Sequence, residues 1–220
     1  MTKEEKKLLV RSKISEILPF RIKEILRNIR NILLLIFCPR FYWTIDSKID
    51  LMNRYIDRYN LNIFVETGTY LGDTLFKQKD NFKKIYSIEL SEYYFDLARK
   101  RFQGFDNINL ILGNSKDKLK DILIENDESI FFWLDGHYST GLTAKAKDKE
   151  TPILEELNTI FDQNTNKHKH VIFIDDARLF NGTHDYPKYK NLRKFIREKD
   201  PRYSVSIESD IIVCIISNTY

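Results

Sequence analysis

The sequence FVETGTYLGDT, at residues 64–74, joins a strand-like run to a helix-like run through two glycines. Gly68 permits a tight turn at the end of a strand, and Gly72 lets the backbone approach a ligand where a helix begins. The free N–H groups of such a helix favour an anionic group such as a carboxylate. The spacing is Gly-x-x-x-Gly with Glu66 two residues earlier, so it matches neither the dinucleotide fingerprint nor a phosphate-binding loop. Taken alone, the stretch fits an ordinary turn equally well.

Strand-like and helix-like segments alternate around and after this turn. Runs rich in β-branched and aromatic residues occur at 62–66, 84–89, 108–112, 130–135 and 170–175. Helix-like stretches separate them at roughly 72–79, 91–103, 116–125 and 151–163. Two further β-type runs, 203–207 and 211–217, flank a polar turn at 208–210 and predict a terminal antiparallel hairpin. We therefore predict an α/β fold: a Rossmann-like, doubly wound, mostly parallel seven-stranded sheet with a C-terminal antiparallel hairpin and an α-helical N-terminal extension.

The N-terminal segment differs from the rest of the chain in charge. Residues 1–40 hold 10 Lys/Arg and 4 Asp/Glu, a net charge of +6, whereas the whole 220-residue chain has a net charge of +4. Residues 20–37 carry apolar side chains at helical spacing between Pro19 and Pro39. This basic amphipathic helix could dock on the domain, self-associate with a second copy of the chain, or make peripheral contact with an anionic membrane. We assign residues 1–59 to a helical basic amphipathic extension and residues 60–220 to a separate domain.

Composition excludes several classes of protein. With 42% hydrophobic residues, 7 Gly and 5 Pro, the chain is neither largely disordered nor collagen-like. Cys38 and Cys214 are too few for a disulfide framework and lack zinc-site spacing, so we expect buried free thiols and a reducing, cytoplasmic compartment. The longest apolar run, 32–38, is far shorter than the roughly 20 residues that span a bilayer. No basic platform interleaved with aromatic residues is present, and we expect no nucleic-acid partner.

Polar residues follow each of the five predicted parallel strands, where ligands bind in open α/β sheets. Glu89 ends the second strand and could accept both hydroxyls of a ribose, or it could simply neighbour a helix N-cap. Asn114 and Ser115 follow the third strand in a polar turn that could face an adenine edge. Residues 135–138, Asp-Gly-His-Tyr, follow the fourth strand, and the pair Asp175-Asp176 follows the fifth.

Taken together, these five strand ends resemble a class I S-adenosylmethionine-dependent methyltransferase, in particular the metal-dependent catechol-type and sugar O-methyltransferases, over residues 60–217. The resemblance implies a methyltransferase domain at 60–220 with S-adenosylmethionine as its cofactor. Cofactor contacts then fall on Glu66, Thr67, Gly68, Thr69, Tyr70, Gly72, Thr74, Glu89, Asn114, Ser115 and Asp135. Metal ligands fall on Asp135, Asp175 and Asp176, and oxygen ligands suit Mg²⁺.

The sequence departs from that family's pattern at three positions. Thr69 stands where many methyltransferases have glycine, and Asp176 stands where the late pair often has asparagine. The lysine that follows the first metal ligand in catechol-type enzymes has no counterpart, because position 138 is tyrosine. These differences weaken the metal and base assignments more than the cofactor assignment.

Methyl transfer from a sulfonium is an in-line displacement in which the acceptor must lose a proton. His137 is the preferred general base because its ordinary pKa lies near neutrality, with Asp135 and Tyr138 completing the catalytic set and His184 in reserve. A Mg²⁺ ion among the three aspartates would orient the acceptor hydroxyl and lower its pKa. Alternatively, these aspartates serve as helix caps and loop acceptors. His168 and His170 precede the fifth strand, and we expect both to be solvated.

Three functions remain open on these residues. The first is an O-methyltransferase that acts, with Mg²⁺ assistance, on a hydroxyl of a small molecule or glycan. The second is metal-independent methyl transfer with His137 as the base. The third is a non-catalytic module that binds the cofactor or a partner and docks through its basic helix. No motif identifies the acceptor.

Overall fold

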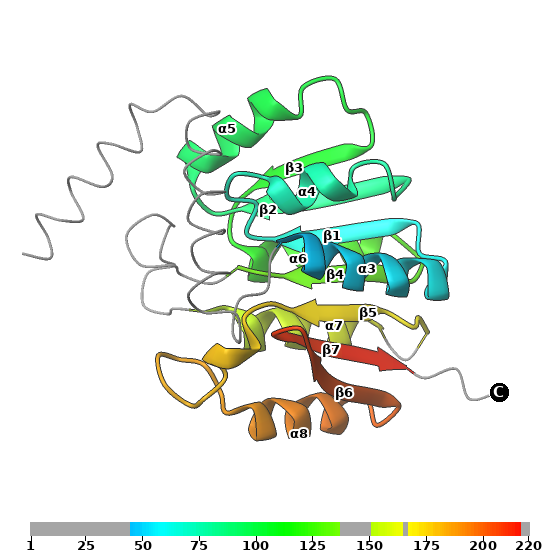
Figure 1. The fold of residues 1–220 in the computed structure, drawn as a ribbon, viewed down its shortest axis with the longest axis vertical. Coiled ribbons are helices and arrows are strands. Elements are labelled where there is room, and N and C mark those ends of the chain that lie inside the picture. The colour runs from blue at the N-terminus through cyan, green and yellow to red at the C-terminus, as the bar shows by residue number, and fades with distance from the viewer. Residues whose placement is uncertain (1–44, 137–150, 165–166, 217–220) are drawn as a thin grey trace, which may run out of the picture. The chain divides into compact units, whose positions relative to one another are not determined.

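The computed structural model describes residues 45–136, 151–164 and 167–216, all of which belong to one compact unit. Residues 20–37, His137 and Tyr138 lie outside the described residues, so the expectations attached to them stay predictions. A seven-stranded sheet forms the centre of the unit (Figure 1). Its strands run in the order β3-β2-β1-β4-β5-β7-β6.

Five parallel strands are followed by an antiparallel pair, as the sequence predicted. The strands are β1 (Ile63–Thr67), β2 (Lys84–Glu89), β3 (Ile108–Leu112), β4 (Ile130–Leu134), β5 (Val171–Ile174), β6 (Tyr203–Glu208) and β7 (Ile211–Ile216). Strand β7 pairs antiparallel with both β5 and β6, and the other pairs are parallel. Each strand boundary agrees with the prediction to within one residue, because the runs are bounded by polar turns.

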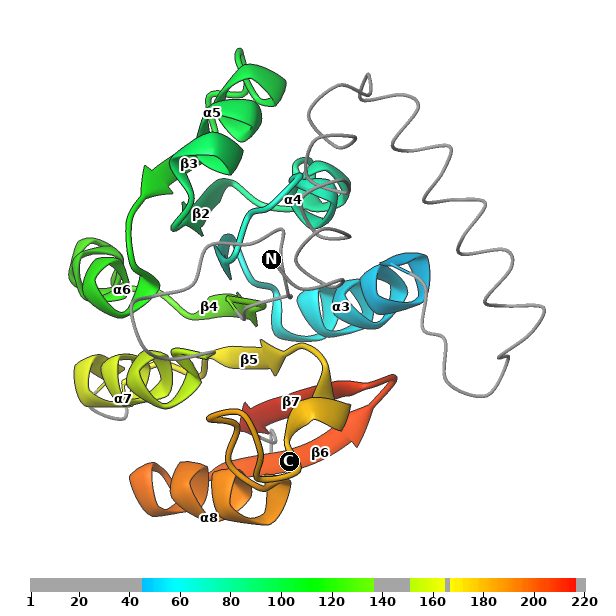
Figure 2. The same cartoon turned by 90° about the vertical axis from the view of Figure 1, so that its left-hand side faces the viewer.

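Helices cover both faces of the sheet (Figure 2). One face carries α3 (Ile45–Tyr59), α4 (Asp73–Gln78) and α5 (Glu92–Arg101). The other carries α6 (Ser115–Glu125), α7 (Ile153–Asn164) and α8 (Tyr189–Lys199). A short 3₁₀ turn, η1 (Ala177–Leu179), follows β5. Neither α3 nor α8 was predicted from the sequence as an individual helix.

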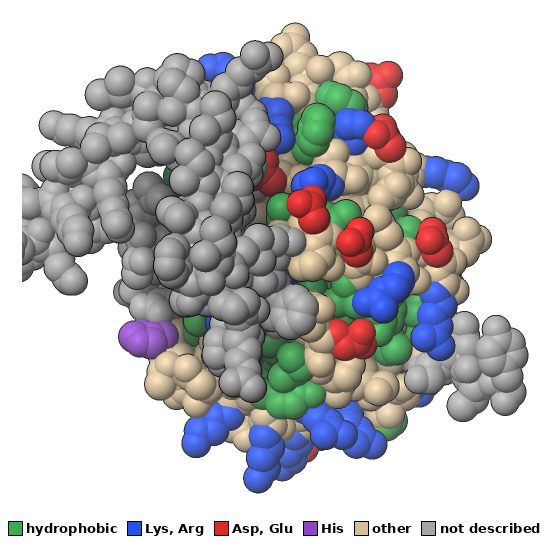
Figure 3. All heavy atoms as spheres, in the orientation of Figure 1, with side chains coloured by type: hydrophobic (Ala, Val, Ile, Leu, Met, Phe, Trp, Pro, Cys, Tyr) green, Lys and Arg blue, Asp and Glu red, His purple; other side chains and the backbone are tan. Residues whose placement is uncertain are grey.

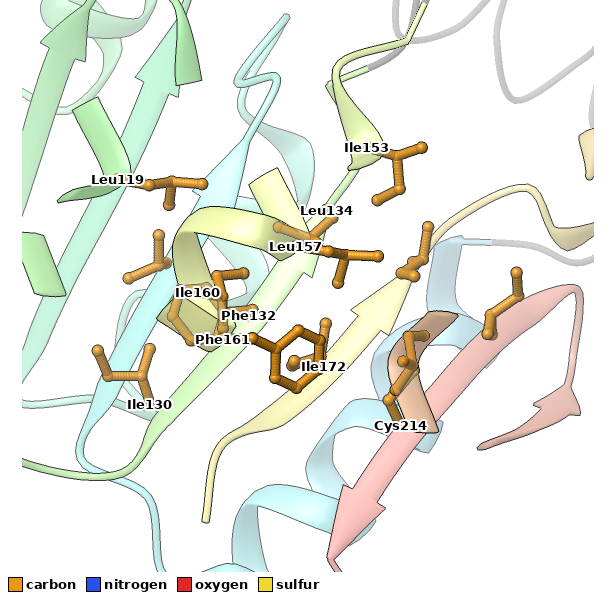
Figure 4. Close-up of a cluster of buried hydrophobic side chains, with 14 of the residues drawn as sticks. Leu119, Ile130, Phe132, Leu134, Ile153, Leu157, Ile160, Phe161, Ile172 and Cys214 are labelled. Atoms are coloured by element: carbon orange, nitrogen blue, oxygen red, sulfur yellow. The ribbon is translucent and has the colours of Figure 1, made fainter. Parts of the chain in front are cut away.

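Alternate strand residues build a separate hydrophobic core on each face. On the α7 face, Phe132, Leu134 and Ile172 meet Leu157 and Ile160 (Figure 4). On the α3 face, aromatic side chains from β1, β4 and β5 pack together, with the Phe131 and Phe173 ring centroids 4.8 Å apart. Each fully buried large side chain contributes about 1.5–3 kcal/mol.

Helix α3 belongs to the core of the described unit. Leu51 and Met52 are 0% exposed and pack in the cluster that contains Phe64 and Trp133. The compact unit that contains the sheet therefore includes α3.

His170 is not solvated, contrary to the expectation from sequence. Its side chain is buried, and Nδ1 accepts a hydrogen bond from the main-chain N–H of Ile130 at 3.1 Å. Burial lowers the pKa of His170 to about 3. Its neighbour His168 lies nearer the surface, where its Nε2 is 2.9 Å from a carboxylate oxygen of Asp127. Strands β4 and β5 are adjacent, and the His170 ring packs against Phe132 of β4 with ring centroids 5.3 Å apart.

The described surface carries charges of both signs. On the face seen in Figure 3, acidic and basic side chains are interspersed, with hydrophobic side chains between them. Within the described residues, no helix combines the length and apolar character needed to cross a membrane. Cys214 is buried as a free thiol, as expected, and burial raises its pKa.

Candidate functional site

The carboxyl ends of the five parallel strands lie side by side, because main-chain hydrogen bonds continue each ladder past the strand ends. The N–H of Gly68 donates to the carbonyl of Ile88 at 2.9 Å, and the N–H of Gly113 donates to that of Glu89 at 2.8 Å. In the same way, the N–H of Asp135 donates to the carbonyl of Thr67 and the N–H of Asp175 to that of Leu134, both at 3.1 Å. We call these strand ends, residues 66–70, 89–90, 112–115, 133–136 and 175–176, the carboxyl rim. Sequence reasoning placed its candidate residues here, and the topology brings them together.

The two glycines of the first turn serve different purposes. Gly68 has φ +84°, and a Cβ there would lie 2.6 Å from the main-chain oxygen of Asp135. Only glycine lets the β1 turn pass so close to the end of β4. Gly72 has φ +71°, but its Cβ would meet the Phe102 ring at 2.6 Å. Gly72 therefore makes room for the Phe102 side chain, and its predicted approach to a ligand stays a prediction.

Glu89 ties the first turn to the second strand. Its Oε2 accepts the N–H of Tyr70 at 2.7 Å, and its Oε1 accepts the N–H of Ser91 at 2.8 Å. Tyr70 adopts φ +48°, and its ring packs against Tyr94 with centroids 4.7 Å apart. Each carboxylate oxygen retains a further lone pair, so Glu89 can still accept a ligand hydroxyl.

Glu66 is a buried carboxyl group on the α3 face of the rim. Its side chain is 1% exposed, and its Oε2 accepts the hydroxyl proton of Ser87 at 2.5 Å. Ser87 Oγ lies 2.6 Å from Thr69 Oγ1. Burial, reinforced by the nearby carboxylates of Asp135 and Glu89, raises the pKa of Glu66 to about 8. Glu66 is thus mostly protonated at neutral pH, and a cation at the rim would favour its ionised form.

The ends of β2 and β3 offer apolar and polar groups together. Leu90 and Leu112 are 37% and 41% exposed, so both offer apolar surface at the ends of these strands. Asn114 caps α6 by accepting the N–H of Lys116 at 3.2 Å, and Ser115 is buried at the start of that helix. This combination suits a flat heterocycle, with leucines against its faces and polar groups at its edge.

The remaining residues of the predicted cofactor set are buried. Thr67 is 0% exposed, and its Oγ1 has no hydrogen-bond partner within the described residues. Thr74 is buried in the first turn of α4. Neither side chain offers an open contact to a ligand in this structure.

Lys48 of α3 contacts the late acidic pair, and sequence reasoning missed it. Its ammonium donates a hydrogen bond to Asp175, lies 3.6 Å from Asp176 and stands 6.0 Å from the Trp133 ring centroid. Burial disfavours its charge, but Asp175, Asp176 and Asp135 outweigh that effect and raise the pKa of Lys48. Lys48 occupies one helical stripe with Leu51, Met52 and Tyr55, and this spacing was the signal available in the sequence.

The late acidic pair is also held by other groups of the protein. The N–H of Asp176 donates to the Asp175 carboxylate at 2.7 Å, and Arg178 donates to Asp176 at 2.7 Å and to Asp210. Within the described residues, no group of three His, Cys, Asp or Glu side chains is arranged to hold a metal ion. The carboxylates of Asp175 and Asp176, which the resemblance assigned to Mg²⁺, pair with Lys48 and Arg178 in this structure.

No family model and no curated protein matches the chain, but solved structures similar to it include methyltransferases. The chain is similar to the O-methyltransferase from Bacillus cereus in complex with SAH, with a TM-score of 0.55 and 17% identity over 95% of this chain and 97% of that chain. It is also similar to the O-methyltransferase TomG from Streptomyces achromogenes, involved in tomaymycin synthesis and solved with SAM (TM-score 0.54, 14% identity, 98% and 99% of the two chains). The SAH-bound methyltransferase PaMTH1 from Podospora anserina is similar with a TM-score of 0.53 and 16% identity, over 98% of this chain and 96% of that chain.

The fold is that of a class I methyltransferase. The similarity establishes the architecture, and the roles of individual residues depend on the geometry described above. In this methyltransferase fold the rim joins Glu66, Glu89 and Asp135 within electrostatic range of one another. The base candidates His137 and Tyr138 lie outside the described residues, and His184 is exposed on the loop between η1 and α8.

Proposed function

We propose that this protein transfers a methyl group from S-adenosylmethionine to a hydroxyl oxygen of a small molecule or glycan. The observation that supports this most is the group of three carboxyls, Glu66, Glu89 and Asp135, at the carboxyl rim of a methyltransferase fold. S-Adenosylmethionine presents a sulfonium and an ammonium, and a site lined with carboxyls favours both cations.

Each part of the cofactor has a suitable partner at the rim. Glu89 would accept the ribose hydroxyls through its remaining lone pairs, and Leu90 and Leu112 would cover the adenine. Glu66 and Asp135 would face the methionine end, where the positive charges lie. The bound sulfonium supplies an electrophilic methyl group.

The reaction requires an oriented acceptor oxygen and a place for its proton. The acceptor's lone pair forms the new C–O bond as the C–S bond breaks, which leaves S-adenosylhomocysteine and a methyl ether. The hydroxyl proton passes to a base, for which His137 is the proposed residue.

Calorimetry with S-adenosylmethionine tests the cofactor assignment. We expect saturable 1:1 binding to the wild-type chain and roughly tenfold or greater weakening in Glu89→Gln, because charge-assisted hydrogen bonds contribute about 1.5–3 kcal/mol. Glu92→Gln is the matched control, since Glu92 is exposed in the first turn of α5 nearby. Absence of binding to the wild-type chain would refute the proposal.

Transfer itself is tested with methyl-labelled S-adenosylmethionine. Pools of hydroxyl-bearing small molecules and glycans are incubated with the protein, and label in the products identifies the acceptor class. Stoichiometric cofactor binding with no labelled product in any pool would favour the non-catalytic binding module instead.

A further inference from the structure

A lysine ammonium stands beside the carboxylates for which a divalent cation was expected. Lys48 donates to Asp175 and lies 3.6 Å from Asp176, and Asp135 is close enough to act on its charge. The side chains of Lys48 and Asp175 are 12% and 9% exposed, so water screens this ion pair only weakly. The Lys48 ammonium therefore supplies positive charge that offsets the negative charge of the late acidic pair.

The surroundings hold this ammonium in place. Leu51 and Met52, three and four residues further along α3, are fully buried against the sheet and fix the helix. The Trp133 ring lies 6.0 Å from the ammonium, within range of a cation–π attraction. Moving the Lys48 ammonium away would leave the Asp175 carboxylate, whose side chain is 9% exposed, without this partner.

The second aspartate of the pair has its own cation. Arg178 donates to Asp176 at 2.7 Å and also to Asp210, so its guanidinium bridges the end of β5 and the turn before β7. A Mg²⁺ ion demands near-octahedral oxygen ligands and gives up its water reluctantly. To bind here it would have to displace two protein cations that repel it.

We propose that Lys48 occupies the place of a divalent ion at the carboxyl rim, excludes Mg²⁺ from Asp175 and Asp176, and makes this methyltransferase metal-independent. The catalytic consequence rests on the proposed function, whereas the exclusion of metal does not. Lys48 acts as a positioning residue that holds the late acidic pair and supplies fixed positive charge beside Asp135.

Titration with Mn²⁺, followed by electron paramagnetic resonance of the free ion, tests the exclusion directly. We expect the full wild-type chain to show no saturable site below about 1 mM, the weak end of protein sites for divalent ions. Lys48→Ala should gain one saturable Mn²⁺ site with a dissociation constant at least about tenfold below that limit, because the carboxylates lose their ammonium partner. Lys77→Ala is the matched control, since Lys77 also pairs with an aspartate, Asp46, but at the surface. It should behave as wild type.

Two results would overturn the proposal. One is a stoichiometric Mn²⁺ site in the wild-type chain that disappears in Asp175→Asn. The other is a Lys48→Ala chain that binds no more Mn²⁺ than Lys77→Ala. If Lys48→Ala does not fold, the wild-type titration still decides, and Lys48→Arg should remain without a site.

The same preparations separate this proposal from the proposed function. Calorimetry with S-adenosylmethionine is run on the wild-type chain with EDTA and with Mg²⁺, and we expect equal affinities. Failure to bind S-adenosylmethionine would refute the proposed function and leave the Mn²⁺ result standing. Cofactor binding that requires Mg²⁺ would overturn metal independence and keep the proposed function.

Discussion

Replacing Glu66 with glutamine should stabilise the protein at neutral pH. Burial raises the pKa of Glu66 from 4.5 to about 8, whereas the unfolded chain ionises near the ordinary value. The folded state therefore keeps a proton that the unfolded state releases, and stability falls as pH rises from about 4.5 to about 8. At about 1.36 kcal/mol per pKa unit, the cost is roughly 3 kcal/mol at pH 7 and about 5 kcal/mol above pH 8. Glutamine keeps the acceptor oxygen for Ser87 without that cost.

Urea denaturation of both chains at several pH values between 4 and 8.5 measures the effect. The difference in unfolding free energy should be small near pH 4 and grow to roughly 3 kcal/mol in favour of Glu66→Gln at pH 7. Glu92→Gln, at an exposed position, should change the unfolding free energy by less than about 0.5 kcal/mol at every pH. A difference between wild type and Glu66→Gln that stays constant across this range would show that Glu66 ionises normally, and the reasoning would fail.

Two further substitutions test the packing at opposite ends of the strands. His170 is buried with its pKa lowered to about 3, so the stability it contributes is present above its ordinary value of 6.5 and is lost as pH falls towards 3. At pH 5 the wild-type chain should have lost about 2 kcal/mol of unfolding free energy through His170. His170→Asn, whose side-chain oxygen can still accept the Ile130 N–H, should not suffer this loss. Its acid-unfolding midpoint, followed by circular dichroism, should therefore lie at lower pH. Gly68→Ala should lower the free energy of unfolding, measured in urea, by roughly 3 kcal/mol, because the new Cβ would lie 2.6 Å from the main-chain oxygen of Asp135. Gly104→Ala, with φ +91° and open space around it, should cost only about 1 kcal/mol. Equal losses in the two alanine variants would contradict the assigned contact.

The parallel strands could be predicted from sequence because their signals are local. Phe64 and Val65, or Phe131 and Phe132, point to opposite faces by the geometry of a strand, and both are apolar because both faces are covered. Once strands alternate with helices, their carboxyl ends must share one edge, so Gly68, Glu89 and Asp135 could be grouped before any coordinates existed.

Other properties of the site depend on which segments pack together. The protonation of Glu66 depends on the burial that its neighbours impose, and the close contact at Gly72 depends on the ring of Phe102, the residue that follows α5. Neither neighbour is specified by the residues adjacent in sequence. The same limitation affected His170, whose polar flanking residues suggested a solvated position.

The sequence by itself determined the order and type of most elements and the edge of the sheet at which the polar residues gather, because hydrophobic periodicity is a property of neighbouring residues. Only the tertiary structure placed Lys48 against Asp175, 127 residues away along the chain. A pattern shows that a helix has an apolar face, but it does not show which part of the sheet that face covers. The identity of the cation at the carboxyl rim was therefore decided by long-range packing.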